Sequence, residues 1–329
     1  MKIICSKSSL LKSVSISLKA VPSKTTMPIL ECILMDATTN QIKFTTNDME
    51  LGIETIVDGI IEEKGKVALD AKIFYEIIRR LPDNDITIKT DDKYAATITC
   101  EKAKFNIPGK SGEDFAYLPM IEKDEPLTIS QYTLKEMIRQ TIFSIAVNEN
   151  NKLMTGELFE IRDNCLKVVS LDGHRIAIRK MPLKREYSDR KVVVPGKTLS
   201  EVSKILSGEV DDQVSIYFTK NHILFEFDQT MVVSRLIEGE YFRIDQMLSS
   251  DYETKLKINK KEFLDCIDRA TLLVREVDKK PIIINITDDN MELRIDSAMG
   301  SMNEEIDIEK EGKDIMIGFN PKFLIDALR

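Results

Sequence analysis

Two kinds of apolar spacing alternate along the chain and predict a mixture of helices and strands. Apolar and polar residues alternate, as in half-buried strands, in segments such as 41–45, 86–89, 166–170, 214–218 and 291–295. Apolar residues follow helical spacing in six segments, at 9–20, 72–81, 133–146, 197–206, 260–274 and 322–329. Many strands with few helices in a fixed order predict an α+β fold of antiparallel sheets covered by helices on one side.

The predicted elements recur three times with a nearly constant period. Asp48 and Asp172, which follow equivalent strands, are 124 residues apart. In the second helical segments, Phe74 and Leu199 are 125 residues apart, and Leu199 and Phe323 are 124 apart. A fixed period of this length indicates three copies of a whole domain rather than a solenoid of small repeats. The expected domains are residues 1–122, 127–248 and 253–329. Since few residues follow the last helical segment, we expect the third copy to be incomplete at its C-terminus, with an exposed strand edge.

Composition narrows the class of protein. The chain has 329 residues, 43% hydrophobic and 31% charged, and no apolar run long enough for a bilayer. Residues 1–7 lack the apolar core of a signal peptide, which predicts a cytoplasmic location. The five cysteines are far apart and form no Cys-x-x-Cys pair. We therefore expect buried free thiols, with no disulfide, metal site or cofactor.

Charge is distributed unevenly between the helical segments and the rest. The net charge is −8, yet the six helical segments contain 14 basic and 7 acidic residues. If these helices line one surface, that surface is basic and suited to binding phosphates without reading sequence. The alternative is that lysine and arginine are simply good helix formers that cover apolar surface with their stems.

One short segment resembles a catalytic site. Asp172-Gly173-His174-Arg175 contains one of only two histidines, and His174 could act as a general base with Asp172 or Asp48. The same four residues also fit a β-turn in which Asp-Gly supplies the positive φ. The sequence has no nucleophile elbow, phosphate-binding loop or metalloprotease helix motif, so a non-enzymatic role is favoured.

Three segments carry a resemblance to a known family: Thr26–Leu30, Ser170–Ala177 and Ile317–Asn320. With them the whole chain resembles the β subunit of bacterial DNA polymerase III, the DNA sliding clamp. The resemblance implies a non-catalytic processivity factor of DNA replication, in which two chains close head-to-tail into a homodimeric ring. Helices would line the hole around double-stranded DNA. The implied partners are the replicative DNA polymerase alpha subunit, the clamp loader and other proteins with clamp-binding motifs, with no membrane.

The resemblance also assigns site residues. It implies DNA contacts at Lys24, Asn148 and Lys197, to which charge alone adds Arg79 and Arg80. It implies a dimer interface formed by Phe105 and Ile107 on one side and by Leu272 and Leu273 on the other. The implied partner-peptide pocket, between the second and third domains, consists of Met154, Leu171, Gly173, His174, Arg175, Ile176, Phe242, Gln246, Met247, Asn320 and Phe323.

Some positions depart from the family pattern. Leu171 stands where the family usually has a small polar residue, Phe242 where it has proline, and Gln246 where some members have arginine. The family's C-terminal tail, which forms one wall of the pocket, is not in this sequence, so we expect weaker peptide binding than with it. Two alternatives remain: an interaction scaffold without a closed ring, and a hydrolase centred on His174.

Overall fold

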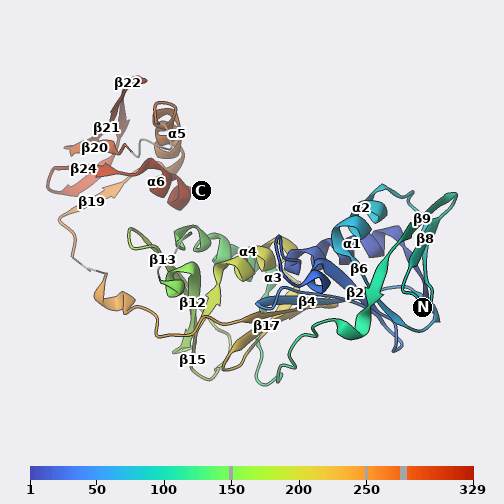
Figure 1. Ribbon diagram of the computed structural model, residues 1–329. Helices are drawn as coiled ribbons and strands as arrows, with labels where there is room; N and C mark the ends of the chain where they lie inside the picture. Colours follow the sequence, from blue (N-terminus) through green and yellow to red (C-terminus); the bar gives the residue numbers. More distant parts are fainter. Residues whose placement is uncertain (148–150, 249–250, 275–279) are drawn as a thin grey trace. The chain divides into compact units, whose positions relative to one another are not determined.

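The computed structural model describes residues 1–147, 151–248, 251–274 and 280–329 (Figure 1). The described residues fall into two compact units, Met1–Gly239 and Glu240–Arg329. Every strand pairing is antiparallel, which confirms the predicted α+β class. The described part of the chain contains six α-helices, each within or overlapping a predicted segment: α1 Lys7–Ser17, α2 Ala71–Arg80, α3 Gln131–Arg139, α4 Gly196–Ile205, α5 Lys260–Thr271 and α6 Pro321–Leu328.

Most of these helices start at a side chain that accepts a hydrogen bond from the first turn. Ser6 accepts from the Ser9 amide before α1, and Asp70, Ser130, Asn259 and Asn320 do the same before α2, α3, α5 and α6. Only α4 begins without such a cap, after Pro195. Six short 3-10 helices lie between the elements: η1 Leu18–Ala20, η2 Pro28–Glu31, η3 Gly112–Asp114, η4 Ile142–Ser144, η5 Lys152–Thr155 and η6 Ile244–Gln246.

The first repeat contributes strands to two sheets. Its strands are β1 Lys2–Ser6, β2 Cys32–Asp36, β3 Ile42–Asn47, β4 Leu51–Val57, β5 Ile60–Glu63, β6 Lys66–Asp70, β7 Asp85–Thr90, β8 Ala96–Cys100, β9 Ala103–Ile107 and β10 Gly109–Ser111. One sheet has the order β5-β1-β7-β8-β9, so β9 is an edge strand. The others begin a larger sheet that continues into the second repeat.

The second repeat follows the same order. Its strands are β11 Leu127–Ser130, β12 Gly156–Arg162, β13 Cys165–Leu171, β14 Ile176–Pro182, β15 Arg190–Pro195, β16 Gln213–Phe218, β17 His222–Phe227 and β18 Thr230–Arg235. One sheet has the order β14-β13-β12-β15, and the other strands complete a nine-stranded sheet, β10-β6-β2-β3-β4-β18-β17-β16-β11. The two repeats join where β4 pairs with β18. This shared sheet explains why three repeats form only two compact units.

The third repeat has fewer strands in its described residues. They are β19 Thr254–Lys257, β20 Ile282–Thr287, β21 Asn290–Ser297, β22 Gly300–Asp307, β23 Glu309–Gly312 and β24 Ile315–Phe319. Their sheets are β22-β21-β20-β24 and β19-β23. The edge strand β24 exposes four large hydrophobic residues, Ile315, Met316, Ile317 and Phe319.

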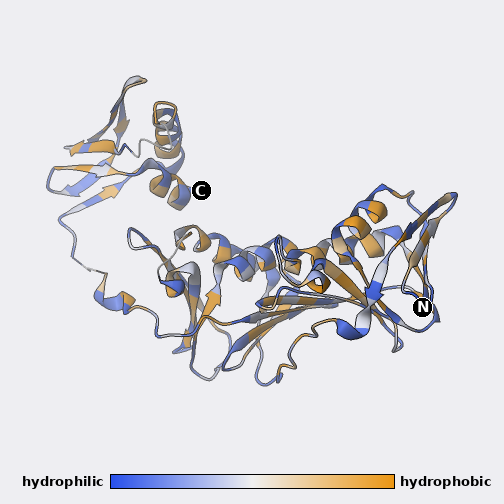
Figure 2. Cartoon of the chain, viewed as in Figure 1, coloured by the Kyte–Doolittle hydropathy of each residue, from blue (hydrophilic) through white to orange (hydrophobic). Residues whose placement is uncertain are grey.

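Each repeat has its own core between helices and sheets, and hydrophobic stretches alternate with polar ones along both (Figure 2). In the first core, the Phe44 and Phe74 rings meet edge to face at 6.2 Å. The second core also includes Ala20, Leu51 and Ile53 from the first repeat, so the two repeats interlock through side chains as well as backbone. All five cysteines are free; four are buried as expected, whereas Cys165 is only half-buried at the start of β13.

Candidate DNA and partner interfaces

The helices of the first two repeats lie along one side of the nine-stranded sheet (Figure 1). Helices α1 and α2 each carry two more basic than acidic residues, and α3 and α4 each carry one more. By contrast, α5 and α6 have no net charge. The basic excess predicted for the helices therefore lies on the first two repeats.

The acidic residues of these helices are paired locally. Helices α2, α3 and α4 contain one carboxylate each: Glu76 lies 2.7 Å from Arg79, Glu136 lies 2.9 Å from Arg139, and Glu201 lies 2.7 Å from Lys204. The hydrogen bond from Arg79 lowers the pKa of Glu76, and Arg139 does the same for Glu136. These pairs moderate the positive surface without removing its net charge.

The candidate DNA contacts within the described residues are all exposed. Lys24 is exposed between η1 and η2. Arg79 and Arg80 are exposed in the last turn of α2, where both pair with Glu76. Lys197, in the first turn of α4, keeps 63% of its side chain exposed although its ammonium pairs with Asp48, which is only 5% exposed. Asn148 lies outside the described residues.

The pairing of Lys197 with Asp48 was missed from the sequence. Asp48 was considered at the end of a strand and as a possible partner of His174, whereas its partner is Lys197, 149 residues away in the second repeat. The period of the repeats contains no signal for such a contact, because it joins two copies rather than equivalent positions within each. The ion pair means that a phosphate has to compete with Asp48 for Lys197.

The segment Asp172–Arg175 is a turn, as the second interpretation predicted. The Asp172 carboxylate accepts hydrogen bonds from the amides of His174 (3.1 Å) and Arg175 (3.2 Å), and Gly173 has φ +80°. The Arg175 side chain returns to Asp172 at 3.0 Å and also lies 5.4 Å from the centre of the Phe143 ring. Arg175 also donates to the Phe143 carbonyl, so it is held on three sides. Phe143 was not predicted, since it lies on η4, far from the turn in sequence.

The remaining pocket candidates are distributed over both compact units. In the first unit, Leu171 is buried at the end of β13, while Met154 on η5 and Ile176 at the start of β14 are half-buried. In the second unit, Phe242 packs edge to face on Tyr241, with ring centres 5.6 Å apart. Gln246 and Met247 are exposed. Asn320 caps α6, and Phe323 is half-buried on that helix.

The candidate self-association residues lie beside free strand edges. Phe105 is 40% exposed on the edge strand β9 and, with Ile73, Ile77 and Arg80 of α2, lines a groove of about 320 Å³. Ile107 is half-buried against the first core. Leu272 directly follows α5 and is 77% exposed, while Leu273 packs against the third core.

One buried carboxyl group stands apart from these interfaces. Glu157 on β12 is fully buried in the second repeat, and neither carboxyl oxygen has a hydrogen-bond partner among the described residues. Burial raises the pKa of Glu157 to about 8; the nearby Thr141 hydroxyl opposes this shift but is itself engaged with the Met137 and Ile138 carbonyls. The folded state therefore holds this side chain largely protonated at neutral pH.

Two absences hold within the described ranges, one of a metal site and one of a membrane span. No group of three histidine, cysteine, aspartate or glutamate side chains there could hold a metal ion. No helix there is long and apolar enough to cross a membrane.

Comparison with known proteins gives the same family along the whole chain. Models of the N-terminal, central and C-terminal domains of the DNA polymerase III beta subunit match residues 1–119, 128–242 and 245–329. A protein named beta sliding clamp from Staphylococcus epidermidis is 36% identical over 323 residues, which cover 95% of this chain and 85% of the relative.

Solved structures agree. A crystal structure assigned as a DNA polymerase III beta subunit from Eubacterium rectale has 71% identity and a TM-score of 0.97. The DNA polymerase sliding clamp from Bacillus subtilis has 34% identity and a TM-score of 0.96. Each alignment covers 100% of this chain and 89% of the other.

The repeated two-helix domain and these matches define a DNA sliding clamp, a processivity factor of DNA replication without catalytic activity. The chain belongs to the DNA polymerase III beta subunit family. The resemblance seen in the sequence is thereby confirmed, and the hydrolase alternative centred on His174 is wrong.

Proposed function

We propose that two copies of this chain close head-to-tail into a ring around duplex DNA, with β9 of one copy paired to β22 of the other. The observation that carries this proposal is the junction between β4 and β18 inside the chain. β22 follows β21 in the third repeat as β4 follows β3 in the first, and β9 ends the β7-β8-β9 meander as β18 ends β16-β17-β18. The two free edges are thus the counterparts of two strands that already pair.

Side chains support the same geometry. At the internal junction, Ala20 and Ile53 of the first repeat pack into the second core. The counterpart of η1, which holds Ala20, is the segment after α5, where Leu272 is exposed. The groove beside Phe105 offers an apolar surface for such a side chain. We assign Phe105 and Ile107 to one side of the interface, and Leu272 and Leu273 to the other.

DNA would pass along the helices and be held weakly. We assign phosphate contacts to Lys24, Arg79, Arg80 and Lys197, since counterion release gives sequence-independent attraction. We assign a further DNA contact to Asn148 from the family resemblance. The ion pairs to Glu76 and Asp48 weaken the contacts of Arg79, Arg80 and Lys197. A weak surface suits a protein that has to slide, because the closed ring rather than a tight grip prevents escape.

Partners would be held through the pocket residues of the second and third repeats. We assign to this pocket Met154, Leu171, the turn 173–176, Phe242, Gln246, Met247, Asn320 and Phe323. Its ligands would be short peptide motifs of the replicative polymerase, the clamp loader and other clamp-binding proteins. The proposed domain boundaries remain 1–122, 127–248 and 253–329, and the proposed location is the cytoplasm.

Retention on circular and linear DNA tests the proposal. The protein would be loaded on a closed circular duplex and followed by gel filtration before and after a single cut that makes the DNA linear. A topological clamp stays on the circle and leaves the linear form by sliding off the ends. Equal retention on both forms would show ordinary DNA binding instead.

A further inference from the structure

A second groove lies on the first unit, where the first two repeats meet. It has a volume of about 280 Å³ and is lined by the turn after β3, by the connector between the repeats and by β17 and β18. Leu118 of the connector and Val233 of β18 form its apolar floor. Met49, Glu50, His222 and Arg235 surround that floor.

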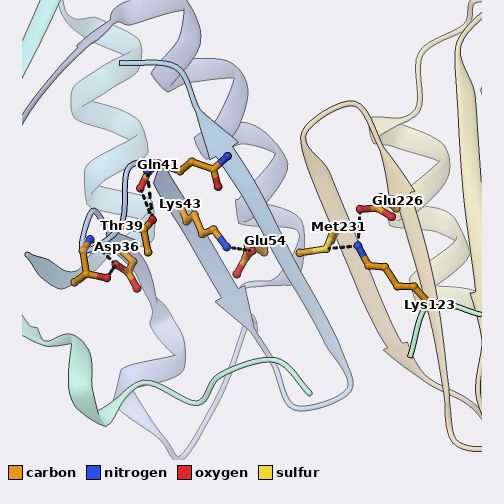
Figure 3. A network of polar contacts seen from close by, with 9 residues as sticks. Asp36, Thr39, Gln41, Lys43, Glu54, Lys123, Glu226 and Met231 are labelled. Carbon is orange, nitrogen blue, oxygen red and sulfur yellow. Dashed lines mark hydrogen bonds and ion pairs between the residues drawn. The ribbon is translucent and has the colours of Figure 1, made fainter. Parts of the chain in front are cut away.

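The wall formed by the connector is fixed in place. The Asn47 side chain donates to the Ala116 carbonyl at 3.1 Å. Further along, Lys123 binds Glu226 at 2.6 Å and contacts the Met231 sulfur, as Figure 3 shows. Leu118 lies so close to Gly52 that a Cβ there would be 2.0 Å from its Cδ2. The groove is therefore preformed, which lowers the entropic cost of binding.

The turn at the groove has the same construction as the turn at Asp172. The Asp48 carboxylate accepts from the amides of Glu50 (3.0 Å) and Leu51 (2.7 Å), as Asp172 accepts from His174 and Arg175. The residue after the aspartate has positive φ in both, +80° at Gly173 and +75° at Met49. Glycine adopts this backbone freely, whereas methionine is strained in it. The turn places the Met49 side chain, which is 51% exposed, at the groove.

The groove also presents an available positive charge. Arg235 is exposed, and within the described residues its guanidinium forms no ion pair. His222 lies nearby, and burial together with the charge of Arg235 lowers the pKa of its imidazole, an effect that Glu50 partly opposes. At neutral pH the imidazole is therefore uncharged, and Arg235 is the cation that faces a ligand.

We propose that this groove is a second docking site, which binds a short extended peptide of a partner protein in which a carboxylate side chain lies next to a large apolar one. The carboxylate pairs with Arg235, and the apolar side chain packs on Leu118, Val233 and Met49. The assignment of a peptide rests on the proposed function in one respect, that the matching turn in the second repeat borders a partner-peptide pocket.

Binding of a defined peptide tests this site on the full chain. The probe is a fluorescein-labelled Ser-Asp-Leu-Phe-Gly peptide with blocked ends, and the matched peptide has asparagine in place of aspartate. Titrations use fluorescence anisotropy. Methionine-methyl NMR reports where the peptide binds, with the Met49 signal assigned from the Met49→Gly variant. We expect the Met49 signal to shift with the aspartate peptide and the asparagine peptide to bind about tenfold more weakly.

Three variants separate this site from the pocket of the second repeat. Arg235→Gln and Met49→Gly should each weaken binding about five- to tenfold. Lys220→Gln, which removes a charge from the turn between β16 and β17, should not. Met49→Gly keeps the fold, because glycine suits the positive φ. If His174→Asp abolishes binding while Arg235→Gln and Met49→Gly leave it unchanged, the peptide uses only the second-repeat pocket and this inference is wrong, although the proposed function stands. No shift of the Met49 signal at about 1 mM peptide would also overturn it.

Discussion

Strands β4 and β18 pair with each other inside the chain, whereas their counterparts in other repeats, β22 and β9, are edge strands. At the internal junction, Ile53 lies opposite Val232 and both are buried. At the free edges, Phe105 and Leu272 remain exposed beside strands with unpaired backbone groups. An exposed strand edge is a template for pairing with another chain. Repeating this one junction between two chains would close the proposed ring without any new type of contact.

The largest expected effect is on self-association. Phe105→Asp places a charge in the apolar groove beside β9, so we expect the dimer to dissociate at micromolar concentration, with a loss of about 2–4 kcal/mol in association free energy. Light scattering after gel filtration measures the mass. Ile60→Asp is the matched control, because Ile60 is an exposed hydrophobic residue on β5, at the opposite edge of the same sheet. A monomeric wild-type chain, or an unaffected mass in Phe105→Asp, would contradict the assignment of this edge.

A substitution at the internal junction of β4 and β18 should instead lower the stability of the folded chain. Ile53→Ala leaves a cavity where the first repeat packs into the second core, so we expect a loss of about 2–4 kcal/mol in the free energy of unfolding. Denaturant unfolding measures it. Ile60→Ala, at an exposed position, should change stability by less than about 0.5 kcal/mol. Similar small losses in both variants would mean that this junction contributes little to the first unit.

Stability should depend on pH through Glu157, which is buried in the second repeat. The pKa of Glu157 is raised to about 8 in the folded state, above its value in an unfolded chain, so the folded state binds the extra proton. The free energy of unfolding should therefore fall as pH rises through about 8. Deprotonation of Glu157 should account for about 1.4 kcal/mol of that fall between pH 7 and 9. Glu157→Gln should flatten that dependence in thermal unfolding curves. The same decline in wild type and variant would exclude Glu157 as its source.

The smallest effect is expected on the DNA surface. Lys24→Glu and Lys197→Glu should each reduce the salt dependence of DNA retention by about one unit of slope, because each removes one phosphate contact. Lys43→Glu is the control, since Lys43 pairs with Glu54 on β3 and β4, away from the helices (Figure 3). An unchanged slope in the Lys24 and Lys197 variants would remove them from the duplex-facing surface.

Much of the fold was predictable because it is local and repeated. Helical spacing identified all six helices of the described residues, and the recurrence of the second helical segment indicated three copies. The turn geometry shared by Asp48 and Asp172 supports the equivalence of the first two repeats. The pairing of β4 with β18 was not predictable, because strand patterns give faces but not partners. The basic excess of the helices could be counted in the sequence. The ion pair between Asp48 and Lys197 could not, because it depends on which strands and helices meet in space. Burial of a carboxyl group at Glu157 runs against its polarity and had no signal in the sequence.

Amide hydrogen exchange as a function of protein concentration tests directly whether β9 of one copy pairs with β22 of the other. The internal strands β4 and β18 should be protected at every concentration, because their pairing lies within one chain. The edges β9 and β22 should become protected together as concentration rises through the dimerisation range, and Phe105→Asp should abolish that gain. If β9 and β22 exchange equally fast at all concentrations while the protein dimerises, the ring does not close by repeating its internal junction.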